Sequence, residues 1–243
     1  MRIKKQWNFD TSIEIEEGYT GRYGAPGKPR EKKRKPTPEE IRRQNQRNRE
    51  NNMRRLIKAN FGKYDCWETI TYRKGDRPTP EEMKADMQRL IRKVRKEYRK
   101  RGHELKYILR MEIGKHGGPH IHILVNAISG TDYRTEVILS QCWDKGHVNS
   151  KTLYESGGYK ELADYIVKEQ QEWEPESLKR YTRSRNLEVP KPRVRKWKAR
   201  SWREPKAPAG WYIDKETFFE GTNPFTGKTY RHYIMYPLKG GSG

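Results

Sequence analysis

The sequence predicts an α+β protein in which an antiparallel sheet of the split βαβ type is backed by helices. Two observations support this class. Between residues 61 and 173 the segments follow one another in the order strand, helix, strand, strand, helix, strand and helix. The strand segments alternate polar and apolar residues, whereas apolar residues in the helical segments recur with the helical period of 3.6 residues.

The first strand and the first helix of this domain have clear signals. Residues 66–72 are rich in aromatic and β-branched side chains, which favour a strand. The segment from Asp76 to Glu82 combines a capping residue, prolines and acids, a pattern that opens a helix. Gly102 ends this helix. Its apolar stripe consists of Met83, Met87, Leu90, Ile91, Val94 and Tyr98.

Two further strands are joined by a glycine-rich turn. Residues 107–113 and 120–125 alternate, and Gly117, Gly118 and Pro119 form the turn between them. The remaining elements are a helix over 132–143, a weaker strand over 147–153 and a third helix from about Tyr159 to Trp173. The first six elements match ferredoxin-like folds, whose helices cover one face of the sheet. The other face is then open, and the third helix crosses or flanks it.

The composition indicates a polyanionic partner. Of the 243 residues, 32% are hydrophobic and 35% are charged, and the formal net charge is +22. Such a charge favours binding to nucleic acid, and a membrane surface is the alternative. No run approaches the length of an apolar membrane-spanning helix, and the N-terminus lacks the apolar region of a signal sequence. With only Cys66 and Cys142, the sequence favours a reducing compartment, the cytoplasm.

Basic segments flank the domain on both sides. Residues 1–60 are predicted to form an arm with one helix, outside any compact core; residues 28–58 hold thirteen Lys or Arg against four Glu. This helix begins near Thr37 and is either solvated or laid along phosphates. Residues 174–243 form a C-terminal extension in which Trp197 and Trp202 suit base stacking, a solvated linker being the alternative. Short strands near 211–213 and 230–236 predict a small hairpin.

A pair of histidines on one strand suits metal binding. His120 and His122 are two residues apart, so both imidazoles project from the same face of the sheet. Glu112 lies on the preceding strand, and the hairpin brings it beside them. Two neutral imidazoles and one carboxylate suit a divalent cation that acts as a Lewis acid on a substrate oxygen. An ordinary pair of histidines is the alternative.

The third helix carries a tyrosine and a lysine that suit nucleophilic catalysis. Tyr165 and Lys168 are three residues apart and are therefore neighbours on the helix surface. Near a metal-bound phosphate, the cation and the ammonium group favour the phenolate, which can attack phosphorus. A partly buried tyrosine beside a lysine is the alternative. Tyr159 is a second candidate, but its spacing places it on another side of the helix.

These motifs together resemble the HUH endonucleases and are most similar to the single-tyrosine initiators of rolling-circle replication, the Rep proteins. The residues that carry the resemblance are Thr69-Ile70-Thr71-Tyr72, His120-Ile121-His122 with Glu112, and Tyr165-Ile166-Val167-Lys168. The resemblance extends over roughly residues 66–173. Many larger relatives also carry a helicase, from which this chain departs. Residues 221–229 place five residues between the glycines where a phosphate-binding loop has four, so we interpret them as a hairpin turn.

The resemblance implies Mn²⁺- or Mg²⁺-dependent nicking and joining of single-stranded DNA. Glu112, His120 and His122 would bind the metal, and Tyr165, assisted by Lys168, would form a 5′-phosphotyrosine intermediate. The implied partners are a hairpin at the replication origin of a plasmid, phage or other mobile element, and host replication proteins. A single-tyrosine transposase or a relaxase is the alternative within the superfamily. A non-catalytic nucleic-acid-binding module is the alternative outside it, because ferredoxin-like sheets also bind RNA on their open face.

Overall fold

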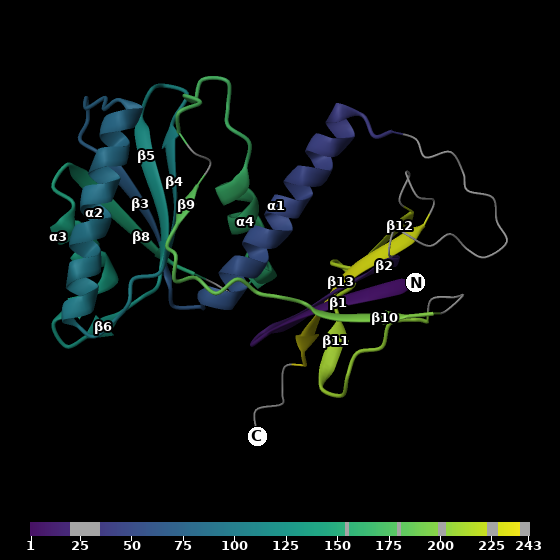
Figure 1. Ribbon diagram of the computed structural model, residues 1–243. Helices are drawn as coiled ribbons and strands as arrows, with labels where there is room; N and C mark the ends of the chain where they lie inside the picture. Colours follow the sequence, from purple (N-terminus) through teal and green to yellow (C-terminus); the bar gives the residue numbers. More distant parts are fainter. Residues whose placement is uncertain (20–34, 154–155, 179–180, 199–202, 223–227, 239–243) are drawn as a thin grey trace. The chain divides into compact units, whose positions relative to one another are not determined.

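The chain divides into two compact units. The structure, a computed structural model, describes residues 1–19, 35–153, 156–178, 181–198, 203–222 and 228–238. The larger unit is Arg43–Val189, and the smaller one combines Met1–Arg42 with Pro190–Gly243. Each unit contains its own sheet (Figure 1). Within the described ranges, no helix has both the length and the apolar character that a membrane crossing requires.

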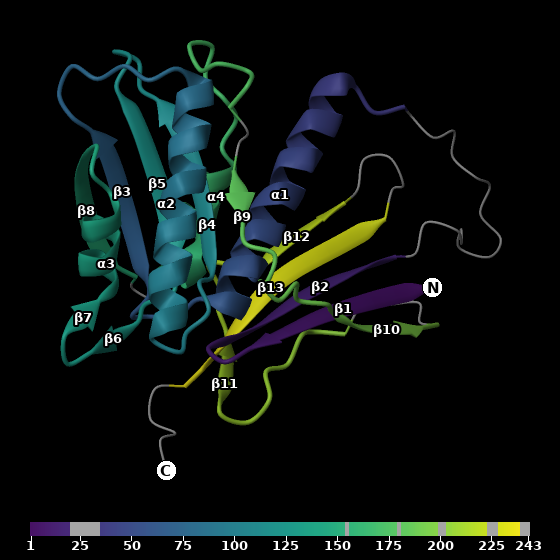
Figure 2. The ribbon, with the colours of Figure 1, turned by 60° about the vertical axis from the view of Figure 1, so that its left-hand side comes forward.

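The larger unit contains a five-stranded antiparallel sheet with the predicted topology. The strands lie in the order β8 (Gly146–Thr152), β3 (Cys66–Tyr72), β5 (Pro119–Val125), β4 (Tyr107–Ile113) and β9 (Thr182–Arg183). The two strands that the first helix connects, β3 and β4, are separated by the antiparallel strand β5 (Figure 2). This is the split βαβ order of a ferredoxin-like sheet, so the predicted fold class is confirmed. The short strand β9 extends the sheet beyond the predicted elements.

One face of this sheet is covered by α2 (Pro80–Lys100) and α3 (Thr135–Cys142). Helix α2 begins at a capping box, in which the Thr79 hydroxyl accepts a hydrogen bond from the Glu82 amide at 3.2 Å and the Glu82 carboxylate accepts one from the Thr79 amide at 2.7 Å. The helix ends before Gly102, whose φ of 77° continues the chain in the left-handed region. The predicted apolar stripe of α2 packs into one buried cluster with the sheet, and Cys66 and Cys142 are free thiols within it.

The opposite face is partly covered, whereas the sequence leaves it open apart from the third helix. Helix α4 (Lys160–Val167) and the second half of α1 (Pro38–Asn60) lie on this side (Figure 1). A second buried cluster contains Met53, Leu56 and Ile57 from α1, Ala163 and Ile166 from α4, and Ile108 and Leu124 from the sheet. The start of α1 is capped by Thr37 and Glu40 as predicted, but its last turns are packed and not merely solvated.

Helix α4 is shorter than predicted. A 3₁₀ turn, η1 (Ser156–Tyr159), precedes it, and it ends at Val167 where the sequence predicts a helix to Trp173. Lys168 already has an extended ψ of 149°. The buried guanidinium of Arg110 donates to the carbonyl oxygens of Ile166 at 3.1 Å and Lys168 at 2.9 Å. These carbonyls therefore have partners at the helix end without a further helical turn.

The smaller unit contains a six-stranded sheet that the sequence does not predict in full. Its order is β10 (Arg193–Trp197), β1 (Arg2–Phe9), β2 (Ser12–Tyr19), β13 (Thr229–Pro237) and β11 (Trp211–Ile213), with β12 (Phe219–Thr222) also paired to β13. Residues 2–19 thus form strands where the sequence predicts an arm outside any compact core. The reason is long-range pairing, because Ile15 is buried with Tyr233 and Met235, more than 200 residues along the chain.

The predicted C-terminal hairpin is present as β12 and β13, which pair up to Thr222 and Thr229. The residues of its predicted turn, 223–227, lie outside the described residues, as does Trp202. His232, for which the sequence offers no partner, has its Nε2 3.0 Å from Glu14 Oε1 on β2. A separate two-stranded ribbon, β6 (Ser129–Gly130) and β7 (Tyr133–Arg134), precedes α3.

The capping box of α2 gives a first prediction. Thr79→Ala removes the acceptor for the Glu82 amide and is expected to lower the free energy of unfolding by about 1 kcal/mol. Thr79→Ser keeps a hydroxyl in place and is expected to cost much less. Urea unfolding followed by circular dichroism measures both variants. Equal destabilisation by alanine and serine would contradict the role of the cap.

Candidate active site

The pairing of β4 with β5 places the predicted metal ligands on one face of the sheet. In the register of these strands Glu112 lies opposite His120, and Arg110 lies opposite His122. Because side chains alternate along a strand, all four project away from α2 and toward α4. Tyr165 lies in the last turn of α4, and Lys168 follows directly after its end.

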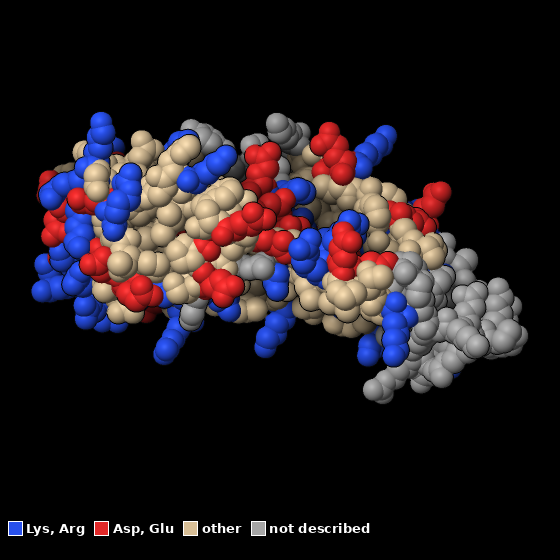
Figure 3. All heavy atoms as spheres, turned by 90° about the horizontal axis from the view of Figure 1, so that it is seen from above, with Lys and Arg blue, Asp and Glu red and all other residues tan. Residues whose placement is uncertain are grey.

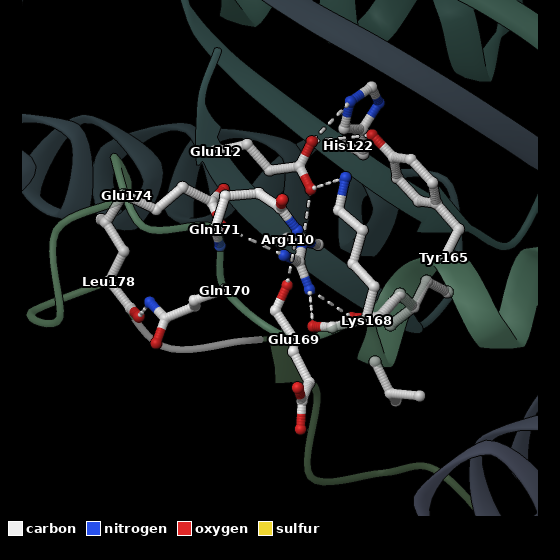
Figure 4. Close-up of polar contacts among 12 residues, drawn as sticks. Arg110, Glu112, His122, Tyr165, Lys168, Glu169, Gln170, Gln171, Glu174 and Leu178 are labelled. Atoms are coloured by element: carbon white, nitrogen blue, oxygen red, sulfur yellow. Dashed lines mark hydrogen bonds and ion pairs between the residues drawn. The ribbon is translucent and has the colours of Figure 1, made fainter. Parts of the chain in front are cut away.

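The carboxylate of Glu112 is the centre of the site (Figure 4). Its Oε2 accepts a hydrogen bond from the Tyr165 hydroxyl at 2.7 Å. Its Oε1 lies 2.7 Å from Lys168 Nζ and 2.5 Å from Arg110 Nε. Glu112 therefore joins the helix that carries the phenol to the strand that carries the imidazoles.

The electrostatic environment keeps Glu112 ionised and Tyr165 protonated. Burial by itself raises the pKa of Glu112, but the hydrogen bonds from Lys168 and Tyr165 and the charge of Arg110 outweigh it and hold this pKa below its usual value. Burial raises the pKa of the Tyr165 hydroxyl, and the adjacent Glu112 carboxylate raises it further. Lys168 Nζ lies 4.2 Å from the centre of the Tyr165 ring, a cation–π distance.

His122 is held in a fixed position beside Glu112. Its ring stacks on Trp67 with centroids 5.5 Å apart and meets the Tyr165 ring edge-on at 5.2 Å. Its Nδ1 lies 3.2 Å from Thr69 Oγ1, so Nε2 faces Glu112 Oε2, at 3.6 Å. Burial lowers the pKa of His122 to about 4, which makes the imidazole neutral at neutral pH. A neutral imidazole is the form that binds metal ions.

His120 lies at the edge of this group. The centroid of its ring is 6.5 Å from that of His122. A Cβ atom at Gly114 would lie 3.0 Å from His120 Nε2, so the glycine leaves room for the ring. Among the described residues no group of three or more His, Cys, Asp or Glu side chains is already arranged around a metal position. The structure thus brings Glu112, His122, Tyr165 and Lys168 together, with His120 next to them.

Arg110 is a site residue whose role the sequence does not reveal. Its side chain is 1% exposed and contacts Glu112, the two carbonyl groups at the end of α4, and Glu174 Oε2 at 3.6 Å. It therefore fixes the end of α4, where Tyr165 and Lys168 lie, relative to β4. The only signal in the sequence is a position on the same face of the strand as Glu112. Trp67, which stacks on His122, also escapes prediction.

Tyr159, the second candidate nucleophile, does not belong to this group. It is buried in the cluster that α1 and α4 form with the sheet. Its φ of 61° places it in the left-handed region immediately before α4 begins. In this structure Tyr165 is the tyrosine that contacts Glu112.

Comparison with known protein families supports a link to DNA replication. Residues 65–170 match the family model of the replication-associated protein ORF2. Over that stretch the chain is similar to this family, and the stretch contains all five predicted site residues, from Glu112 to Lys168. No curated protein and no solved structure matches the chain.

The contacts of Arg110 give a second prediction. Arg110→Met leaves Glu112 and Glu174 without their buried counter-charge and is expected to lower the free energy of unfolding by about 3–5 kcal/mol. The matched control is Arg101→Met, which removes an arginine from a more exposed pair with Glu97 and is expected to cost less than about 1 kcal/mol. Urea unfolding measures both. Similar losses for the two variants would contradict the role of Arg110.

Proposed function

We propose that the chain is a metal-dependent endonuclease that nicks and rejoins single-stranded DNA and so initiates rolling-circle replication of a small mobile element. The observation that carries the proposal is the 2.7 Å hydrogen bond from the Tyr165 hydroxyl to Glu112, on the sheet face that also carries His120 and His122. The similarity of residues 65–170 to replication-associated proteins supports the biological setting.

Tyr165 is the nucleophile in this proposal. Its phenolic oxygen attacks the phosphorus of the scissile phosphodiester and forms a new O–P bond, while the bond from phosphorus to the 3′ oxygen breaks. Glu112, ionised and 2.7 Å away, is the nearest acceptor for the phenolic proton. The departing 3′ oxygen takes a proton from water. The products are a 5′-phosphotyrosine and a free 3′-hydroxyl, which can prime synthesis and can reverse the step to rejoin strands.

Lys168 stabilises the charge that develops in this step. Its ammonium group lies over the Tyr165 ring and also contacts Glu112. In that position it can offset negative charge on the phosphoryl oxygens as the phenol attacks. Arg110 is fully engaged with main-chain carbonyls and carboxylates, so we assign it a positioning role.

The donor set fits a divalent cation such as Mn²⁺ or Mg²⁺. Glu112, His120 and His122 offer one carboxylate and two imidazoles on one face of the sheet, and His122 is neutral. A carboxylate has about four lone-pair positions, and Glu112 uses three of them for Tyr165, Lys168 and Arg110, which leaves one for a metal. When bound, the cation would supply Lewis acidity to a phosphoryl oxygen of the substrate.

The substrate we propose is single-stranded DNA at a replication origin, presented as a hairpin, with host replication proteins as further partners. The net charge of +22 supports a polyanionic substrate. A transposase or a relaxase would use the same residues on a different DNA. Cleavage assays with an origin, an element end and a transfer origin separate these functions, and preference for the origin is expected.

The nucleophile gives a third prediction. Wild-type protein with Mn²⁺ and a single-stranded oligonucleotide is expected to form a covalent adduct that survives SDS gel electrophoresis, and Tyr165→Phe is expected to form none. Tyr159→Phe is the matched control, because it removes a buried hydroxyl from another part of the fold, and it is expected to form the adduct. An adduct with Tyr165→Phe would end the assignment.

The metal ligands give a fourth prediction, measured by calorimetric titration with Mn²⁺ in the absence of DNA. His122→Ala and Glu112→Gln are each expected to weaken Mn²⁺ binding by more than about 100-fold, because loss of even an outer partner of a ligand costs 10–100-fold. His120→Ala is expected to do the same. His147→Ala, on the edge strand β8, is the matched control and is expected to leave binding unchanged. Equal Mn²⁺ binding by all variants would favour a non-catalytic binding module.

A further inference from the structure

A cavity of about 490 Å³ lies on the other face of the sheet from the candidate active site, between α2 and β4. This volume is in the range of small-ligand sites. Its walls are mainly apolar and include Met87, Ile91, Leu109 and Met111, with Tyr107 at one end. Leu109 and Met111 alternate along β4 with Arg110 and Glu112, so the cavity and the candidate active site lie back to back on one strand.

A stripe of cations on α2 borders this cavity. Arg92 and Arg95 line the cavity, and they also line a neighbouring hollow of about 470 Å³ whose remaining lining residues are Lys96, Arg99 and Lys100. These positions recur every three or four residues and therefore share one side of the helix. Figure 3 shows Lys and Arg side chains crowded at the left-hand end, where Figure 1 places α2 and α3.

Most of the stripe is not neutralised by acidic side chains. Other cations of α2 have carboxylate partners: Arg89 pairs with Asp86, Lys93 with Asp144 and Lys100 with Glu97. Within the part of the chain that the structure describes, Arg92, Arg95, Lys96 and Arg99 form no salt bridge. Adjacent like charges repel one another, and a bound polyanion would relieve that repulsion.

The edge strand β9 connects the two faces of the sheet. Thr182 is paired with Leu109 and lines the cavity, whereas the flanking Tyr181 packs against the buried cluster on the face of the active site. Arg183 and Arg185 are exposed beside them. This is the basic and aromatic segment, residues 181–185, that the sequence marks as suited to a single strand. A strand leaving the active site can therefore follow this edge to the cavity.

We propose that the cavity and the cation stripe of α2 form a second site for single-stranded DNA, which holds the strand beyond the nick. An unstacked base enters the apolar cavity beside Tyr107, and the neighbouring phosphates lie along Arg92, Arg95 and Arg99. A duplex offers phosphates but no free base, so the apolar walls favour a single strand. The inference rests on the proposed function for the direction in which the strand arrives, and not for binding itself.

The test measures binding without cleavage. Fluorescence anisotropy in the presence of EDTA compares wild type, Arg92→Glu/Arg95→Glu and the control Lys63→Glu/Lys151→Glu on a long single-stranded oligonucleotide. The control makes the same change in net charge at two exposed lysines, one of them on β8 at the opposite edge of the sheet from β9. Loss of two phosphate contacts is expected to weaken binding by more than about tenfold at low salt and to make the salt dependence shallower by about 1.4. The control is expected to lose much less.

A second variant tests the cavity without changing charge. Gln88→Trp, at an exposed position of α2 that lines the cavity, is expected to fill the space for the base and weaken single-strand binding severalfold. Circular dichroism checks that each variant is folded. Equal losses for the α2 and control variants, or tighter binding of duplex than of single strand, would overturn the proposal. Failure of the proposed function would instead appear as a missing covalent adduct with the wild-type protein.

Discussion

The candidate site depends on one buried carboxylate that is shared by three donors. Glu112 receives the phenol of Tyr165, the ammonium of Lys168 and the guanidinium of Arg110. An ionised carboxylate inside a protein is stable only when it has such partners, so the three side chains are held together by the cost of leaving it unpaired. The same carboxylate faces His122, so a single side chain connects the proposed nucleophile with the proposed metal ligands.

Strand β4 organises both faces of the sheet because its side chains alternate. Arg110 and Glu112 belong to the candidate active site, while Leu109 and Met111 line the cavity beside α2. A change in β4 therefore acts on both sites at once. The proposed path of the DNA uses this arrangement, since the basic edge at β9 lies next to both faces.

Local patterns in the sequence were sufficient to predict the sheet of the larger unit and the residues of the candidate site. Alternation along two strands puts Glu112, His120 and His122 on one face, and the capping signal at Thr79 marks the start of α2. The strands of the smaller unit could not be predicted in this way, because β2 pairs with β13 at the other end of the chain. The role of Arg110 was also hidden, since it binds main-chain carbonyls 56 and 58 residues away.

The central claim is that Tyr165 forms a bond with DNA phosphorus, and mass spectrometry of the trapped complex tests it most directly. Wild-type protein is incubated with Mn²⁺ and a single-stranded oligonucleotide, the DNA and the protein are digested, and the modified peptide is sequenced. The account predicts a 5′-linked nucleotide on Tyr165. A nucleotide on any other residue, or no modified peptide despite cleaved DNA, would contradict it.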